Sequence, residues 1–236
     1  MRSRPAPAPP GPGRAAAPAP TRRHPLGSRA DDLTALTGGA VALQPLVAGV
    51  VVRADPDGPA ARAAAEVLGT PLPVRPGTWA ATAARDGGDP GTVVWLGPDE
   101  WLVLSDEPRP EALEQRLRAA LAPLGGSAVD VSAHRVSLRL TGPHARDVLA
   151  AGCSIDTHPS VFGAGAAAQT LLGQAGVVLL SRSDAGDEYE LLVRSSFARY
   201  LADWLLDAFV EHRYAATEHD QPDDPRPGRR TEGATA

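Results

Sequence analysis

Apolar residues recur along the chain at two spacings, which separate predicted strands from predicted helices. Short apolar runs with turn residues at their ends predict strands: TVVWL, WLVLS, AVDVS, RVSLRLTG, AAQTLLG, GVVLLSR and YELLVR. Helical spacing predicts helices in AARAAAEVLG, EALEQRLRAALAPLG, PHARDVLAAG and SSFARYLADWLLDAFVEH. Strands that alternate with helices and hairpins indicate an α+β fold, in which helices pack on mixed, largely antiparallel sheets.

The ends of the predicted helices carry typical start and stop residues. Gly69 closes the first helix, and Pro143 lies in the first turn of the third. The hydroxyl of Ser195 or Ser196 can cap the last helix. The predicted apolar faces of the second and last helices consist of Leu113, Leu117, Ala120 and Leu121, and of Phe197, Leu201, Trp204, Leu205 and Ala208.

The two ends of the chain differ in composition from its middle. Proline, alanine and arginine dominate residues 1–29, and proline at this density permits neither a helix nor a sheet. The stretch HDQPDDPRPGRRTEGATA near the other end has a similar character. We therefore predict disordered tails at 1–29 and 212–236 around one α+β domain at 30–211, a length that suits a single core.

Charge and composition exclude several classes of function. The net charge is −5, which argues against nucleic acid as a partner. All 23 basic residues are arginine, and the absence of lysine excludes Schiff-base chemistry and the P-loop. Cys153 is the single cysteine, so no intrachain disulfide can form. No apolar run has the length of a membrane span, and we expect a cytoplasmic protein with no membrane partner.

The stretch VVWLGPDEWLVL places two tryptophans around a turn. Asp99 and Glu100 are adjacent, and adjacent turn residues seldom converge on one substrate as paired acid–base catalysis requires. Gly-Pro-Asp is itself a strong turn signal, so we favour a hairpin over a catalytic pair. Trp95 and Trp101 can pack in the core of the protein or in an interface between subunits.

The stretch DVSAHR contains the residue types of a hydrolytic triad. On a strand, Asp130, Ser132 and His134 would lie on one face. Alternate residues of a strand are about 7 Å apart, too far for the hydrogen-bonded chain of a triad. A polar sheet face or edge is the favoured interpretation.

Two further patterns lack the context that their chemistry requires. GAGAAA (163–168), with Asp184 downstream, matches a dinucleotide-binding pattern, but no buried strand precedes it and Gly173 breaks the helix that should come after it. A loop that uses glycine torsions is the favoured interpretation. Cys153, Asp156 and His158 are too few and too mixed for a metal site. We therefore predict no catalytic, cofactor-binding or metal-binding residue on this chain.

Four segments in order resemble a known family: WLGPDEWLVL, DVSAHRVSLRLTGPHARDVLAAGCSIDTHP, FGAGAAAQTLLGQAGVVLL and YELLVRSSFARYLADWLLDA. Together they are similar to the gamma subunit family of heterotetrameric sarcosine oxidase. The resemblance runs from about Leu46 to Glu211, and this chain carries an inserted Ala133.

The family also resembles the folate-binding domain of aminomethyltransferase, the T-protein of glycine cleavage. In that group a DVS strand and a G-x-G-A-x-x-x-T segment recur, matched here by Asp130–Ser132 and Gly163–Thr170. Where the T-protein has Arg-Asp before its threonine, this chain has Ala168 and Gln169, which argues against a working aminomethyltransferase.

The resemblance implies a role in an enzyme complex. The complex oxidatively demethylates sarcosine with oxygen and tetrahydrofolate, giving glycine, methylenetetrahydrofolate and hydrogen peroxide. The resemblance implies alpha, beta and delta subunits as partners, with FAD, FMN, NAD and zinc on those subunits and no cofactor on this one. Trp95, Trp101 or both are then candidates for the subunit interface. A free-standing folate-binding protein with one-carbon transferase activity is the alternative.

Overall fold

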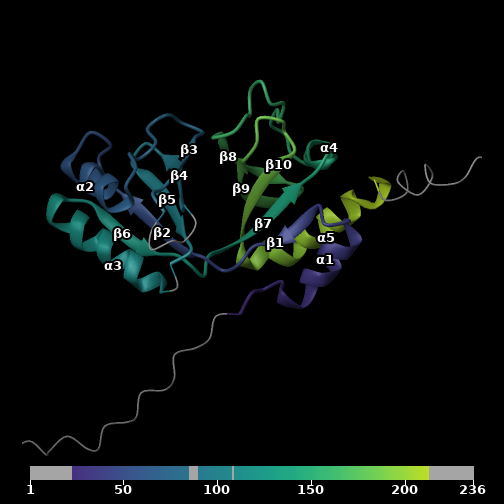
Figure 1. The fold of residues 1–236 in the computed structure, drawn as a ribbon, viewed down its shortest axis with the longest axis horizontal. Helices are drawn as coiled ribbons and strands as arrows, with labels where there is room; N and C mark the ends of the chain where they lie inside the picture. Colours follow the sequence, from purple (N-terminus) through teal and green to yellow (C-terminus); the bar gives the residue numbers. More distant parts are fainter. Residues whose placement is uncertain (1–22, 85–89, 108, 213–236) are drawn as a thin grey trace, which may run out of the picture.

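Two five-stranded sheets form the centre of the molecule, each covered by helices on its outer side (Figure 1). The computed structural model describes residues 23–84, 90–107 and 109–212. Every pair of neighbouring strands in these ranges is antiparallel. The predicted α+β class is therefore confirmed, with sheets that are antiparallel throughout.

We call the two sheets the terminal sheet and the inserted sheet. The terminal sheet has the strand order β1 (Val41–Leu43), β7 (Arg135–Thr141), β10 (Glu188–Arg194), β9 (Ala175–Ser181), β8 (Ala167–Leu172). The inserted sheet has the order β3 (Trp79–Ala81), β4 (Thr92–Gly97), β5 (Glu100–Ser105), β2 (Ala48–Arg53), β6 (Ser127–Asp130). All strands of the inserted sheet lie between β1 and β7 in the sequence, so this half interrupts the other.

Helices cover the outer face of each sheet because their apolar stripes match the apolar face of the strands. On the terminal sheet lie η1 (Gly27–Arg29), α1 (Ala30–Leu36), α4 (Ala145–Ala150), η3 (Ser195–Phe197) and α5 (Ala198–Ala208). On the inserted sheet lie α2 (Pro59–Leu68), α3 (Pro110–Leu121) and η2 (Ala122–Leu124). Gly69 ends α2 in the left-handed conformation, as predicted.

The inner faces of the two sheets also pack together. In β9, Val177 and Leu179 face the helices, while Val178 and Leu180 face the inserted sheet. Val94 and Leu102 of β4 and β5 join Val178 and Leu180 in one apolar cluster. The molecule is thus layered as helices, sheet, sheet and helices.

The structure corrects the predicted limits of the domain. Leu26 is fully buried in the core of the terminal sheet, so the packed chain begins before Ala30. At the other end, the ring of His212 stacks on that of His144, 4.3 Å between centroids, and so belongs to the domain. The remaining predicted tail residues, 1–22 and 213–236, lie outside the described ranges.

Three local predictions about helices are also wrong. Neither Ser195 nor Ser196 caps α5: the serines form η3, and the Ser195 hydroxyl donates to the carbonyl of Ala133 (2.8 Å). This additional turn rotates Phe197 away from the core, where it is 43% exposed. Pro143 precedes α4, which begins at Ala145.

Candidate functional site

The adjacent carboxylates of the β4–β5 turn bind one arginine. Arg53 Nη2 lies 2.7 Å from Asp99 Oδ2, and Arg53 Nη1 lies 3.0 Å from Glu100 Oε2. The hydrogen bond and charge of Asp99 raise the pKa of Arg53. Both carboxylates therefore serve to hold the hairpin to the end of β2, in agreement with the hairpin interpretation.

The two tryptophans of this hairpin are paired across it, but only one of them is accessible. Trp101 is 0% exposed, and its indole N–H donates to the carbonyl of Pro73 (2.7 Å). Trp95 is half-buried and packs against the same cluster, between the inserted sheet and its helices. Trp101 is thus a core residue, and its prediction as an interface residue is wrong. The interface role of Trp95 stays a prediction.

The residues of DVSAHR do not lie along one strand face. Strand β6 ends at Asp130, and a turn separates it from β7. The Asp130 carboxylate accepts hydrogen bonds from the Ser132 hydroxyl and from its backbone N–H (2.9 Å), and Ser132 Oγ accepts one from Gly49 N–H (2.8 Å). His134 is exposed, and its Nδ1 lies 3.4 Å from Arg135 Nη1. Asp130 and Ser132 therefore close a turn.

The glycine-rich segment is a loop, as predicted. Gly165 has φ +85°, and the segment leads into strand β8 where a dinucleotide site requires a helix. Asp184 accepts a hydrogen bond from Ala164 N–H (2.9 Å), and a Cβ at Gly163 would lie 2.9 Å from the same carboxylate. The carboxylate considered as a ribose ligand therefore fixes the loop itself.

The three residues weighed as metal ligands, Cys153, Asp156 and His158, make separate local contacts. Cys153 is buried, with its Sγ 3.8 Å from Thr170 Oγ1. Asp156 accepts from the backbone N–H of His158, and His158 Nδ1 lies 2.8 Å from Ser160 Oγ. Within the described ranges, no three His, Cys, Asp or Glu side chains are placed to hold a metal ion.

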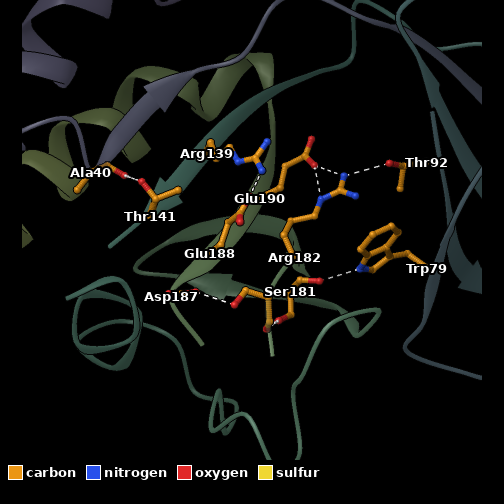
Figure 2. A network of polar contacts seen from close by, with 11 residues as sticks. Ala40, Trp79, Thr92, Arg139, Thr141, Ser181, Arg182, Asp187, Glu188 and Glu190 are labelled. Atoms are coloured by element: carbon orange, nitrogen blue, oxygen red, sulfur yellow. Dashed lines mark hydrogen bonds and ion pairs between the residues drawn. The ribbon is translucent and has the colours of Figure 1, made fainter. Parts of the chain in front are cut away.

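A polar network that the sequence analysis missed joins the two sheets (Figure 2). Arg182, just after the end of β9, donates through Nε to Glu190 Oε2 of β10 (2.9 Å) and forms an ion pair with it through Nη2. The same Nη2 donates to Thr92 Oγ1 of β4, in the other sheet (3.0 Å). Both charged side chains are largely buried, at 18% and 16% exposure.

Trp79 completes this network from the inserted sheet. The Arg182 guanidinium lies 4.1 Å from the centroid of the Trp79 ring, a cation–π contact. The indole N–H of Trp79 donates to the carbonyl of Ser181 (3.0 Å). The alternation of strand residues could have indicated Arg182, because it shares the face of Val178 and Leu180. The sequence does not show, however, that a second sheet covers this face. We infer that the network fixes how the two sheets sit together.

The pKa values of His24, His134 and Tyr189 are shifted mainly by burial. Burial lowers the pKa of His24, whose Nδ1 accepts the Leu26 N–H (3.1 Å). Burial and the charges of Arg135 and Arg194 lower the pKa of His134. Burial raises the pKa of Tyr189, whose hydroxyl donates to the carbonyl of Thr157 (3.3 Å). These groups are spread over the molecule and do not converge on one pocket.

Within the described ranges, no helix has the length and apolar character that a membrane crossing requires.

Comparisons with known sequences place the chain among gamma subunits. A family model described as "Sarcosine oxidase, gamma subunit family" matches residues 53–211. The sarcosine oxidase subunit gamma of Corynebacterium sp. (strain P-1) is 37% identical over 194 residues, covering 80% of this chain and 91% of the relative. The corresponding subunit of an Arthrobacter species matches with the same identity and coverage.

Solved structures extend the comparison. A chain of the heterotetrameric sarcosine oxidase from Corynebacterium sp. U-96, in complex with pyrrole 2-carboxylate, superposes with a TM-score of 0.71 at 32% identity, covering 80% of this chain and 95% of that chain. Aminomethyltransferase T of the glycine cleavage system from Bartonella henselae reaches a TM-score of 0.51 at 17% identity over 74% of this chain and 48% of that chain, which is a likeness of fold. The chain belongs to the sarcosine oxidase gamma subunit family.

Proposed function

We propose that this chain is the non-catalytic gamma subunit of a heterotetrameric sarcosine oxidase, the flavoenzyme that oxidatively demethylates sarcosine. One observation carries the proposal: the chain matches nearly the whole of a chain from such a complex, in sequence and in fold. The geometry of the candidate residues supports it. Each carboxylate weighed above has a partner within the fold: Asp99 and Glu100 bind Arg53, Asp130 accepts from Ser132, and Asp184 accepts from Ala164 N–H.

The partners of the chain in this proposal are the alpha, beta and delta subunits. FAD, FMN, NAD and zinc are then bound by those subunits, and tetrahydrofolate accepts the one-carbon unit within the complex. The cytoplasm is the compartment that we propose for the assembly. Trp95 remains the tryptophan that we propose for a subunit contact, because it is half-buried at the edge of an apolar cluster.

Co-expression of a tagged chain with the three other subunits tests the proposal. We expect a yellow complex on affinity purification and gel filtration, with sarcosine-dependent formation of hydrogen peroxide. The tagged chain alone should be colourless and inactive. A chain that purifies alone from this mixture, or that oxidises sarcosine by itself, would contradict the proposal.

A free-standing folate-binding protein is the second candidate, and the likeness to aminomethyltransferase T is the observation that favours it. Function resides in a site and does not follow from a shared fold. Isothermal titration of the full chain with tetrahydrofolate separates the candidates. Tight binding at one site per chain would favour this second candidate, and no heat of binding is expected for the gamma subunit.

A further inference from the structure

The inner face of the terminal sheet carries a hollow of about 610 Å³ beside the apolar cluster between the sheets. Its lining includes Arg135, Arg194, Gly176, Leu171 and Phe197. The hollow is distinct from the Arg182 network, because none of the side chains of that network lines it.

The row of residues across the sheet explains why this place is hollow. Arg135 of β7 pairs directly with Arg194 of β10. Gly176 comes next in the same row on β9, because it precedes Val177, the partner of Val193. Leu171 of β8 pairs with Gly176. A Cβ placed on Gly176 would meet nothing within 4 Å, so the missing side chain leaves open space between the arginines and Leu171.

The two arginines are like charges in directly opposite positions, an arrangement that destabilises a sheet unless an anion compensates it. Within the part of the chain that the structure describes, no carboxylate lies within ion-pair distance of either guanidinium. Glu100 acts on Arg135 only through its charge and is already bound to Arg53 (3.0 Å). Arg135 instead contacts the ring of His134. Within the described ranges, no ion pair therefore neutralises the two arginines of this row.

The large apolar side chains of Leu171 and Phe197 line the same hollow as the two arginines. Leu171 is 55% exposed and Phe197 is 43% exposed. A small anion would satisfy the guanidinium groups and leave both apolar side chains in water. A protein segment that carries a carboxylate beside an apolar side chain would cover all of them, and arginine with an aromatic neighbour is typical of interface centres.

We propose that this hollow is a docking surface for an acidic side chain of another subunit, held by Arg135 and Arg194 and flanked by contacts to Leu171 and Phe197. The inference rests on the proposed function, because the partner segment belongs to the same assembly. The pair of arginines then contributes to the affinity and orientation of the subunit contact through charge complementarity.

Two variants of the gamma chain in the co-expressed complex test the docking surface from different directions. Arg135→Gln with Arg194→Gln removes the charge and keeps a polar side chain at each position. Gly176→Leu keeps the charge and fills the hollow from its floor. We expect each to weaken assembly at least about tenfold, measured as the dissociation constant by mass photometry on dilution. The matched control, Arg62→Gln with Arg75→Gln, removes two exposed arginines of the inserted half and should assemble like the wild type.

A second measurement separates docking from damage to the fold. Removing two opposed like charges should leave the melting temperature of the full chain equal or higher, while assembly weakens and loses part of its salt dependence. A fall in melting temperature that matches the loss of assembly would overturn the proposal.

Crosslinking identifies the occupant. A photoreactive benzoylphenylalanine at Leu171 should crosslink to an Asp- or Glu-containing peptide of another subunit. A crosslink to residues 213–236 of the same chain would overturn the inference, and so would assembly of both variants at wild-type affinity. These results leave the proposed function intact if the wild type assembles. If the wild type does not assemble, the proposed function fails and this inference fails with it.

Discussion

Trp95 and Trp101 are paired across the β4–β5 hairpin and belong to the same apolar cluster, yet only Trp101 is fully buried. The register of the hairpin shifts between Trp95 and Gly97, so counting alternate residues through the turn does not assign a face to each ring. Local turn chemistry made the hairpin predictable from Gly-Pro-Asp. The burial of Trp101 depends on Pro73 and on helices that are distant in the sequence, and so could not be predicted.

The indole of Trp101 is expected to matter more for stability than that of Trp95. Trp101→Phe removes the donor to the Pro73 carbonyl and leaves space in a closed core, at a cost of about 2–3 kcal/mol. Trp95→Phe, the matched control in a half-buried position, should cost about 1 kcal/mol or less. Urea unfolding of the full chain measures both free energies of unfolding. Equal losses would contradict the assignment of Trp101 to the core.

His24 is expected to make the stability of the chain depend on pH. Its pKa is lowered by burial, and its Nδ1 is occupied as an acceptor for Leu26 N–H. The unfolded state therefore binds a proton more readily, so the free energy of unfolding should fall as the pH falls through 6.5. His24→Asn can keep an acceptor for this N–H without titrating. Between pH 8 and pH 5.5, the free energy of unfolding of this variant should fall less than that of the wild type. An identical pH dependence of the two proteins would refute this role.

At the scale of elements, the glycine that ends α2 was predictable, whereas helix starts and helix faces that depend on neighbouring turns were not. Gly69 ends α2 with φ 67°, a torsion that glycine adopts without strain. The face of α5 was misjudged at Phe197, because η3 precedes the helix and changes the direction of that side chain. Whether a serine caps a helix or forms a separate turn depends on its partner, here Ala133.

Two glycines at helix ends give a matched test of this argument. Gly69 and Gly125 both adopt the left-handed conformation after a helix. A Cβ at Gly125 meets nothing within 4 Å, so Gly125→Ala should cost about 1–2 kcal/mol of backbone strain alone. A Cβ at Gly69 would lie 2.5 Å from Ala83 Cβ, so Gly69→Ala should cost more. Thermal unfolding of the two variants measures the difference, and an equal loss would show that the contact relaxes without cost.

At the scale of the whole molecule, the packing of one sheet on the other could not be predicted from the sequence. Alternation along a strand indicates two faces, but it does not show that both will be covered. Arg182 and Glu190 would therefore be expected as exposed charges, whereas they lie between the sheets and Arg182 bonds to Thr92. The prediction that this chain has no self-sufficient active site rests on residue spacing and turn signals, and it stays a prediction.

The role of the Arg182 network at the junction between the sheets can be tested by removing the positive charge of Arg182. Arg182→Gln leaves the largely buried Glu190 without its cation and should cost about 2–3 kcal/mol. Arg139→Gln is the control: its ion pair with Glu188 is more exposed, at 45% and 29%, and should be worth about 0–1 kcal/mol. Replacing Arg182 and Glu190 together by methionine should restore most of the stability. Urea unfolding of all three variants measures this, and equal losses for the two arginines would exclude a special role for the junction.

The interruption of the terminal sheet has a consequence for the order of events during synthesis. Val41 of β1 pairs with Leu140 of β7, about 100 residues later in the chain. At a translation rate of about 5–20 residues per second, β1 waits on the order of 5–20 s for its partner. The strands of the inserted sheet emerge together within that interval and can pair at once. The inserted sheet can therefore form before β1 has a partner. Until β7 emerges, β1 and the apolar side chains of Leu26 and Leu33 beside it stay accessible to a chaperone.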